Sequence, residues 1–282
     1  MTKIALLFGV LLLLLLVGLF LWRALDHRAD KVEFVRLLAL QPTEPALFDR
    51  SMVETLPEPA RRYFHFAIKE RTPLFTVAEI SMRGQFGMGD KSAPNYLPMR
   101  AKQVLAVPEG FIWKMSGGSG VLRVSGSDSA SWTRFWLAGI VPVARAGGTR
   151  DHALSSLGRY LSEAVFWTPA AVLPRPDVVW TALDKDTARV TVTRDGAEQA
   201  VDVTVDPEGR PVRVFLQRWS NANPDGVYQL QPFGGTLSAF REVEGFRIPT
   251  HVEAGNFMGT DAYFPFFIAD VTDIRFDPLS GG

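Results

Sequence analysis

Four polar side chains of the types used in acid–base and nucleophilic chemistry recur along one segment. His152, Ser156, Arg159 and Glu163 are spaced by four, three and four residues, so on a helix each would lie beside the next. Arg159 and Glu163 would form an acid–base pair or orient a polar head group, and His152 beside Ser156 would form a weak nucleophile pair. The alternative is an exposed helix face with one surface ion pair, worth well under about 1 kcal/mol. Spacing alone leaves both interpretations open.

The segment that carries these residues predicts an amphipathic helix over 151–166. Thr149 is a suitable N-cap, and Pro169 ends the pattern. The apolar positions at helical spacing predict a core face, and the polar positions predict a solvent face. The core face comprises Ala153, Leu154, Leu157, Tyr160, Leu161, Ala164 and Val165, and the solvent face His152, Ser155, Ser156, Arg159, Ser162 and Glu163.

Most of the chain after Phe75 alternates with period two, which is typical of antiparallel strands. Residues 188–193, 201–206 and 212–216 predict three neighbouring strands of a meander. Residues 132–137 and 261–276 are apolar on both faces and therefore need cover on both sides. The predicted helix can cover one side. The other must meet a second layer, a curled part of the same sheet or an apolar ligand.

Aromatic residues are the second indication of a binding site, with 20 Phe, 7 Trp and 5 Tyr in 282 residues. Large rings usually fill a core. The Pro- and Gly-containing segment 231–235 and the aromatic run around Pro265 also fit the mouth of an apolar cavity of lipid size. On that interpretation the ligand-binding residues are Trp113, Trp136, Tyr160, Phe233, Phe264 and Phe266.

The N-terminus predicts a membrane helix, because Ile4–Trp22 carries no charge and would span about 28 Å. A cleaved signal peptide is the competing interpretation, but no small-x-small cleavage site follows. We expect a membrane anchor over 1–25, a helical stalk or linker over 26–46 and a single β-rich domain over 47–278. Four basic residues after the span favour a cytoplasmic domain, whereas the short N-terminal tail favours an exported domain. We expect the domain to be exported.

Composition narrows the function classes. The formal net charge is zero, with 30 basic and 30 acidic residues, so no global field attracts nucleic acid. The chain has no cysteine, which excludes disulfides, thiolate metal sites and a lipidated cysteine anchor. Its four histidines are not spaced as metal ligands. We therefore expect no metal, no cofactor and no nucleic-acid partner, and the sequence does not identify protein partners.

Several phrases together resemble an uncharacterised family of bacterial proteins, a domain of unknown function often carried behind a single membrane helix. The resemblance covers roughly residues 47–276 and implies no assigned catalytic residue. The phrases are LPEPARRY at 56–63, GRYLSEA at 158–164, DPEGRP at 206–211, PFGG at 232–235, GFRIPT at 245–250 and GNF at 255–257.

The expected architecture is mainly β (α+β), with a curved antiparallel sheet, or half-barrel, that carries helices on its concave side. This architecture is similar to the LolA/LolB-like periplasmic lipoprotein carriers, by analogy alone. The chain departs from those carriers in having an apolar N-terminal helix with no cleavage site and no cysteine. Free diffusion to another membrane is therefore not expected.

Three functions remain open at this point. The first is a non-enzymatic, membrane-tethered protein of the bacterial inner membrane that holds a lipid or other apolar ligand in its curved sheet. The second is an envelope hydrolase-type enzyme that uses Arg159, Glu163 and His152. The third is a non-catalytic scaffold for an envelope complex, which would present an exposed apolar patch.

Overall fold

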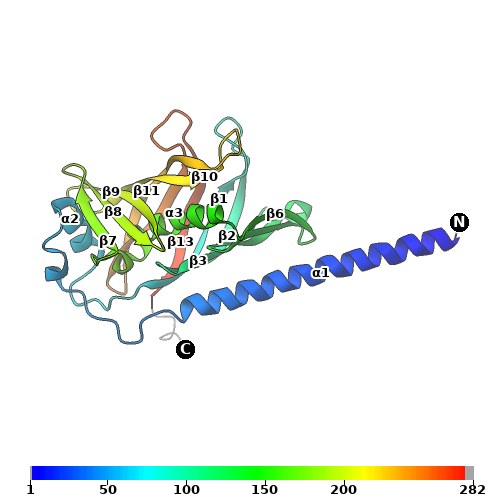
Figure 1. Cartoon of the computed structure of the whole chain (residues 1–282), viewed down its shortest axis with the longest axis horizontal. Coiled ribbons are helices and arrows are strands. Elements are labelled where there is room, and N and C mark those ends of the chain that lie inside the picture. Colours follow the sequence, from blue (N-terminus) through cyan, green and yellow to red (C-terminus); the bar gives the residue numbers. More distant parts are fainter. Residues whose placement is uncertain (1, 277–282) are drawn as a thin grey trace.

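The computed structural model describes residues 2–276, which form one long antiparallel sheet, a long N-terminal helix and two shorter α-helices (Figure 1). The α-helices are α1 (Thr2–Leu38), α2 (Glu58–Ala67) and α3 (Arg150–Trp167), and short 3₁₀ turns occupy Arg50–Val53, Gly120–Leu122 and Pro169–Val172. The strands are β1 (Val77–Gly87), β2 (Tyr96–Ala106), β3 (Gly110–Gly117), β4 (Val124–Ser129), β5 (Trp132–Leu137), β6 (Val141–Gly147), β7 (Val178–Ala182), β8 (Thr187–Arg194), β9 (Ala197–Val205), β10 (Pro211–Ser220), β11 (Gln229–Val243), β12 (Phe246–Asn256) and β13 (Phe264–Arg275).

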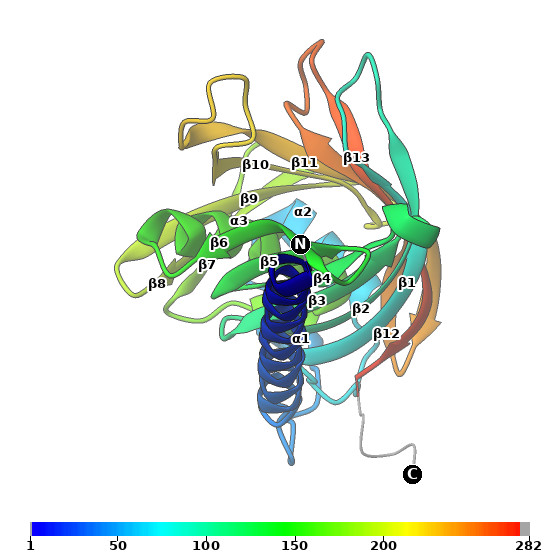
Figure 2. The ribbon, with the colours of Figure 1, turned by 90° about the vertical axis from the view of Figure 1, so that its right-hand side faces the viewer.

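The sheet has the order β6-β5-β4-β3-β2-β1-β13-β12-β11-β10-β9-β8-β7. It curls around a central space (Figure 2). Every neighbouring pair is antiparallel, and the predicted meander β8-β9-β10 pairs Val190 with Val201 and Val203 with Val214. Their alternate residues are buried because one face of these strands meets the core. The prediction of a mainly β fold with a curved antiparallel sheet is therefore confirmed.

Two helices pack within the curve of the sheet. Helix α3 lies across the concave face against β9, β10 and β12. Helix α2 closes one end of the curve, where Tyr63 and Phe64 pack their rings 5.5 and 5.3 Å from the ring of Trp180. The main hydrophobic core thus lies between the concave face and these two helices.

Helix α1 packs on the opposite, convex face. It is continuous through Leu38, and Leu37 joins Val77, Val104 and Ile112 in a small apolar cluster separate from the main core. Among residues 2–276, α1 is the one helix that is long and apolar enough to cross a membrane. The expected boundaries at residues 25 and 46 remain predictions, and the helix continues through the first of them.

Polar contacts attach α1 to the convex side of β4–β6. The Asp26 carboxylate accepts hydrogen bonds from the indole Nε1 of Trp136 at 2.8 Å and from Arg145 Nη1 at 3.0 Å. The Asp30 carboxylate accepts from Ser127 Oγ at 2.6 Å. The outer aromatic face of β5, which was expected to need cover, is therefore covered by α1, the helix that the sequence predicts as anchor and stalk.

Candidate functional site

Helix α3 positions the polar residues singled out in the sequence. As expected, the Thr149 side chain caps its first turn by accepting from the backbone N–H of His152, and the helix ends just before Pro169. Gly158 allows α3 to approach β9 and β10 closely, since a Cβ there would lie 3.0 Å from Gln199 Oε1 and 3.2 Å from Arg218 Cγ. The helix therefore packs closely against the concave face.

The predicted solvent face of α3 is wrong. His152 and Ser156 are only 7% and 5% exposed, and Ser162 is buried, whereas Ala153 on the predicted core face is exposed. The physical reason is that the curved sheet contacts α3 on more than one side and β4 supplies polar partners. His152 Nε2 lies 3.2 Å from the backbone carbonyl oxygen of Ser129, which also accepts a hydrogen bond from Ser156 Oγ.

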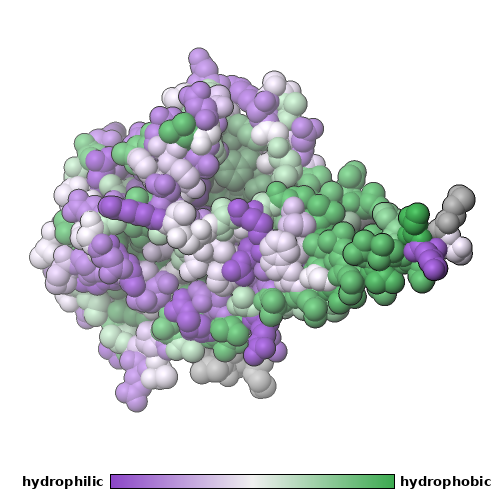
Figure 3. Space-filling model, turned by 45° about the vertical axis from the view of Figure 1, so that its right-hand side comes forward, coloured by the Kyte–Doolittle hydropathy of each residue, from purple (hydrophilic) through white to green (hydrophobic). Residues whose placement is uncertain are grey.

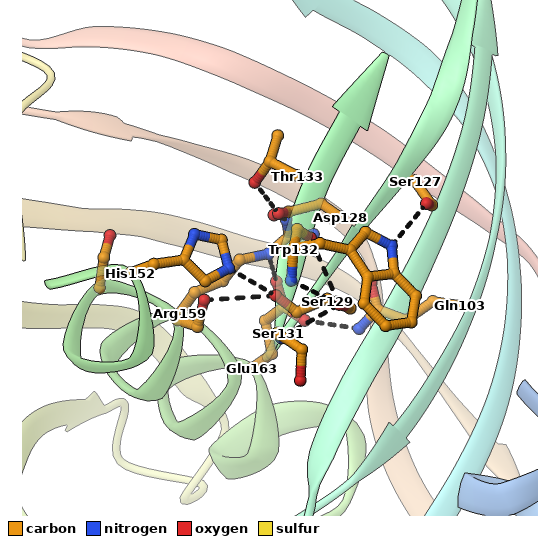
Figure 4. Close-up of polar contacts among 12 residues, drawn as sticks. Gln103, Ser127, Asp128, Ser129, Ser131, Trp132, Thr133, His152, Arg159 and Glu163 are labelled. Carbon is orange, nitrogen blue, oxygen red and sulfur yellow. Dashed lines mark hydrogen bonds and ion pairs between the residues drawn. The ribbon is translucent and has the colours of Figure 1, made fainter. Parts of the chain in front are cut away.

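Arg159 is the centre of a buried polar cluster, shown in Figure 4. Its Nε donates to Glu163 Oε1 at 2.9 Å and its Nη1 donates to Asp128 of β4. Gln103 of β2 donates to the other oxygen of Glu163. Burial alone would lower the pKa of Arg159, but the Glu163 and Asp128 carboxylates outweigh it and raise that pKa. Arg159 therefore stays charged and links α3 to the sheet.

This cluster forms one end of an apolar cavity of about 390 Å³ between α3 and the concave face. Apart from the polar cluster, its walls are mostly aromatic and aliphatic side chains. They include Phe86, Trp113, Met115, Phe135, Val214, Phe233, Val252, Phe266 and Phe267. The guanidinium carbon of Arg159 lies 4.6 and 5.1 Å from the ring centroids of Phe111 and Trp113, so the charged end of the cavity continues directly into aromatic surface.

Arg218 is a second cation at the cavity wall, and it differs from Arg159. Its Nε and Nη2 donate to the backbone oxygen and Oγ of Ser155 at 3.1 and 3.3 Å, and its guanidinium lies 5.0 Å from the ring of Phe233. No carboxylate lies within ion-pair distance in the part of the chain that the structure describes. Burial, together with the positive charge of Arg159, lowers the pKa of Arg218 to about 10.

The structure brings together only part of the predicted ligand-binding set. Trp113, Phe233 and Phe266 line the cavity. Trp136 instead faces α1, Tyr160 donates to the Pro108 carbonyl oxygen, and Phe264 packs 5.8 Å from Tyr96. Trp136 lies outside the cavity because side chains alternate along β5 and Phe135 takes the inward position. Tyr160 of α3 and Phe264 of β13 are likewise not among the residues that line it.

Arg218 lines the cavity and was not predicted to do so, although the sequence contains a signal for it. Arg218 has the same parity along β10 as Val214 and Leu216, which are both buried. A charged residue at an inward position of an alternating strand indicates either a partner or a ligand. Phe86 and Phe135 also line the cavity and were not predicted.

The fold and site define a class: a curved antiparallel sheet that encloses an apolar cavity beneath a helix, with charged groups at one end. The chain belongs to DUF6544, a family of unknown function whose sequence profile matches residues 46–268. The resemblance to an uncharacterised family is thus confirmed. No curated protein matches the chain significantly.

Two solved structures are similar to this chain. One is a LolA superfamily protein from Nitrosomonas europaea, with 11% identity and a TM-score of 0.36 over 83% of this chain and 96% of that chain. The other, from Vibrio parahaemolyticus, is described as an outer membrane lipoprotein-sorting protein domain. It shows 11% identity and a TM-score of 0.37 over 80% of this chain and 91% of that chain.

Proposed function

We propose that the protein is a membrane-tethered binding protein that holds the acyl chain of a lipid, or another apolar ligand, in the cavity beneath α3. The observation that carries the proposal is the cavity itself. Its volume of about 390 Å³ is within the roughly 300–1,000 Å³ of small-molecule sites, and a mostly apolar wall with a few convergent polar groups is typical of such sites.

The polar end of the cavity favours an amphiphilic ligand with an anionic or oxygen-rich head. Arg218 is a partly buried cation without a carboxylate partner among residues 2–276, and such a charge is stabilised by an anion. The indole Nε1 of Trp113 is buried with no hydrogen-bond partner in the same residues, although buried donors are usually paired. A ligand oxygen would satisfy either group.

The tether in this proposal is the apolar part of α1, Ile4–Trp22, in the inner membrane of a bacterium with the domain outside the cytoplasm. Its length matches a bilayer core. A long domain that follows a membrane span is translocated largely without regard to the charges after the span.

The acid–base alternative receives less support from the geometry. Arg159 and Glu163 pair with each other and with Asp128 and Gln103. His152 is directed to a backbone carbonyl oxygen, not to the hydroxyl of Ser156. The side chains that an acid–base site requires are thus engaged in contacts that hold α3 on the sheet.

Uptake of a fluorescent fatty acid, 11-(dansylamino)undecanoic acid, by the full chain in amphipol tests the proposal. We expect saturable fluorescence enhancement that oleate displaces. Ala254→Phe and Ala144→Phe, which place rings in the cavity wall, should weaken uptake at least tenfold. Ala182→Phe, at an exposed position on β7, is the matched control and should leave uptake unchanged. Absence of saturable uptake by the unaltered chain would refute the proposal.

A further inference from the structure

Six strand connections lie along one edge of the sheet. Because neighbouring strands are all antiparallel, the turns β1–β2, β3–β4, β5–β6, β8–β9, β10–β11 and β12–β13 share that edge, and the remaining hairpin turns share the other. Met88 and Val143, which line the cavity, lie close to the first edge and are half exposed. The cavity therefore opens toward this edge, here called the rim.

The rim carries most of the large apolar side chains that the sheet exposes. Four of its six connections, or the strand ends beside them, present such residues: Met88, Val121, Leu122, Ile140, Val141, Val143, Val227 and Leu230. In the described connections of the opposite edge, Leu183 is the one comparable residue. Single exposed apolar residues are ordinary, but their concentration at one edge around a cavity mouth marks an interaction surface.

Helix α1 points its apolar end toward the rim. Asp30 bonds Ser127, which lies beside Trp132 at the start of β5. Trp22 packs its ring 5.6 Å from Trp136, near the end of β5. Strand β5 therefore runs along α1 in the opposite direction, and the β5–β6 turn that follows lies beside the apolar segment (Figure 1). Figure 3 shows a hydrophobic recess on the side of the domain from which α1 projects.

We propose that the rim rests in the interfacial layer of the same bilayer that α1 enters, so that the cavity opens directly onto lipid. This inference rests on the proposed tether and cavity. Continuity with the apolar segment of α1 identifies the occupant as a phospholipid bilayer. Trp22, at the end of that segment, is of the residue type enriched at membrane interfaces. Ligand exchange then needs no passage of an acyl chain through water.

Single-cysteine labelling tests this placement cleanly, because the chain has no native cysteine. Leu122→Cys, Ile140→Cys and Val227→Cys at the rim would each carry an NBD fluorophore in the full chain, reconstituted in phosphatidylcholine–phosphatidylglycerol nanodiscs. Leu183→Cys and Glu208→Cys are the controls, since both positions are exposed but lie in connections of the opposite edge. Val17→Cys in α1 reports on the tether.

We expect blue-shifted emission and at least twofold quenching by doxyl-labelled lipid at the rim positions and at residue 17, with neither effect at the two controls. Rim labels that emit like the controls while residue 17 is quenched would overturn the inference and leave the tether standing. An unquenched label at residue 17 would overturn the inference and the tether together. Failure of fatty-acid uptake with quenched rim labels would refute the cavity function and leave the rim placement standing.

Discussion

The two faces of β4 and β5 each bury a carboxylate–arginine cluster, and the two clusters have different surroundings and different roles. On the convex face, Asp26 of α1 contacts Arg145 and Arg134, and the rings of Trp22 and Trp136 pack beside them. On the concave face, Arg159 of α3 contacts Asp128 and Glu163 next to an open cavity.

The difference is what surrounds each cluster. The outer cluster is covered by aromatic rings and attaches a helix. The inner cluster also attaches a helix, but it lines the cavity. Beside it lies Arg218, an arginine with no carboxylate within ion-pair distance in residues 2–276. Because side chains alternate along a strand, the same pair of strands can hold a helix on one face and line an open cavity on the other.

The largest effect is expected from Arg159→Leu, which leaves Asp128 and Glu163 buried without their partner. The Arg159 side chain is 15% exposed, and breaking a buried ion pair costs about 3 kcal/mol or more. Urea unfolding of the full chain in dodecyl maltoside measures the loss. Arg189→Leu removes a pair whose arginine is 42% exposed and should cost below about 1 kcal/mol. Equal losses would contradict the role of the inner cluster.

Asp26→Asn should weaken the attachment of α1 to the sheet, with a smaller effect than that of Arg159→Leu. The change removes the charge that Arg145 and Arg134 contact, and hydrogen bonds to charged groups contribute about 1.5–3 kcal/mol. Hydrogen exchange over residues 23–38 should accelerate about tenfold. Glu33→Gln, which breaks a pair within α1 itself, is the control. Unchanged exchange in Asp26→Asn would show that apolar contacts alone attach the helix.

Arg218→Gln should alter ligand preference more than stability. Loss of one charge-assisted contact should weaken oleate binding about tenfold, equivalent to about 1.4 kcal/mol, and leave oleyl alcohol binding unchanged. Displacement of the dansylated fatty acid measures both affinities. Arg213→Gln, at an exposed position on the same strand, should affect neither. A parallel loss for acid and alcohol would mean that Arg218 only shapes the wall.

The smallest effect concerns pH on the convex face. A hydrogen bond to Asp270, aided by Glu253, raises the pKa of His251 above its usual 6.5 against the effect of burial. A raised folded-state pKa stabilises the protein fully below pH 6.5 and less as pH rises through the raised value. His251→Gln should therefore cost below about 1 kcal/mol at pH 5.5 and nothing at pH 9. Urea midpoints at both pH values check this, and a larger loss at pH 9 would contradict it.

The sequence predicted which helices and strands form better than it predicted how they pack against one another. Period-two alternation located the meander, and apolar spacing located α3, because both patterns are local. Which side of α3 faces polar partners depends on Asp128 and Ser129, more than twenty residues earlier, and no local pattern contains that pairing. The attachment of α1 was not predicted, because the partners of Asp26 and Asp30 are Trp136 and Ser127, which lie far away along the chain.

The lining of the cavity was predicted in part for the same reason. Residue type identified Trp113, Phe233 and Phe266 as cavity candidates, but it also selected Trp136, Tyr160 and Phe264, which lie outside the cavity. The parity of Arg218 with Val214 and Leu216 was the overlooked signal.

Photo-crosslinking tests the central claim, that the concave face binds an acyl chain, most directly. The full chain in nanodiscs would be irradiated with a fatty acid that bears a diazirine in its chain, and the adducts mapped by peptide mass spectrometry. The account predicts adducts on cavity residues, foremost Phe86, Phe135, Val214 and Phe266, that excess oleate suppresses. Adducts confined to Ile4–Trp22 and the convex face, and insensitive to oleate, would contradict it.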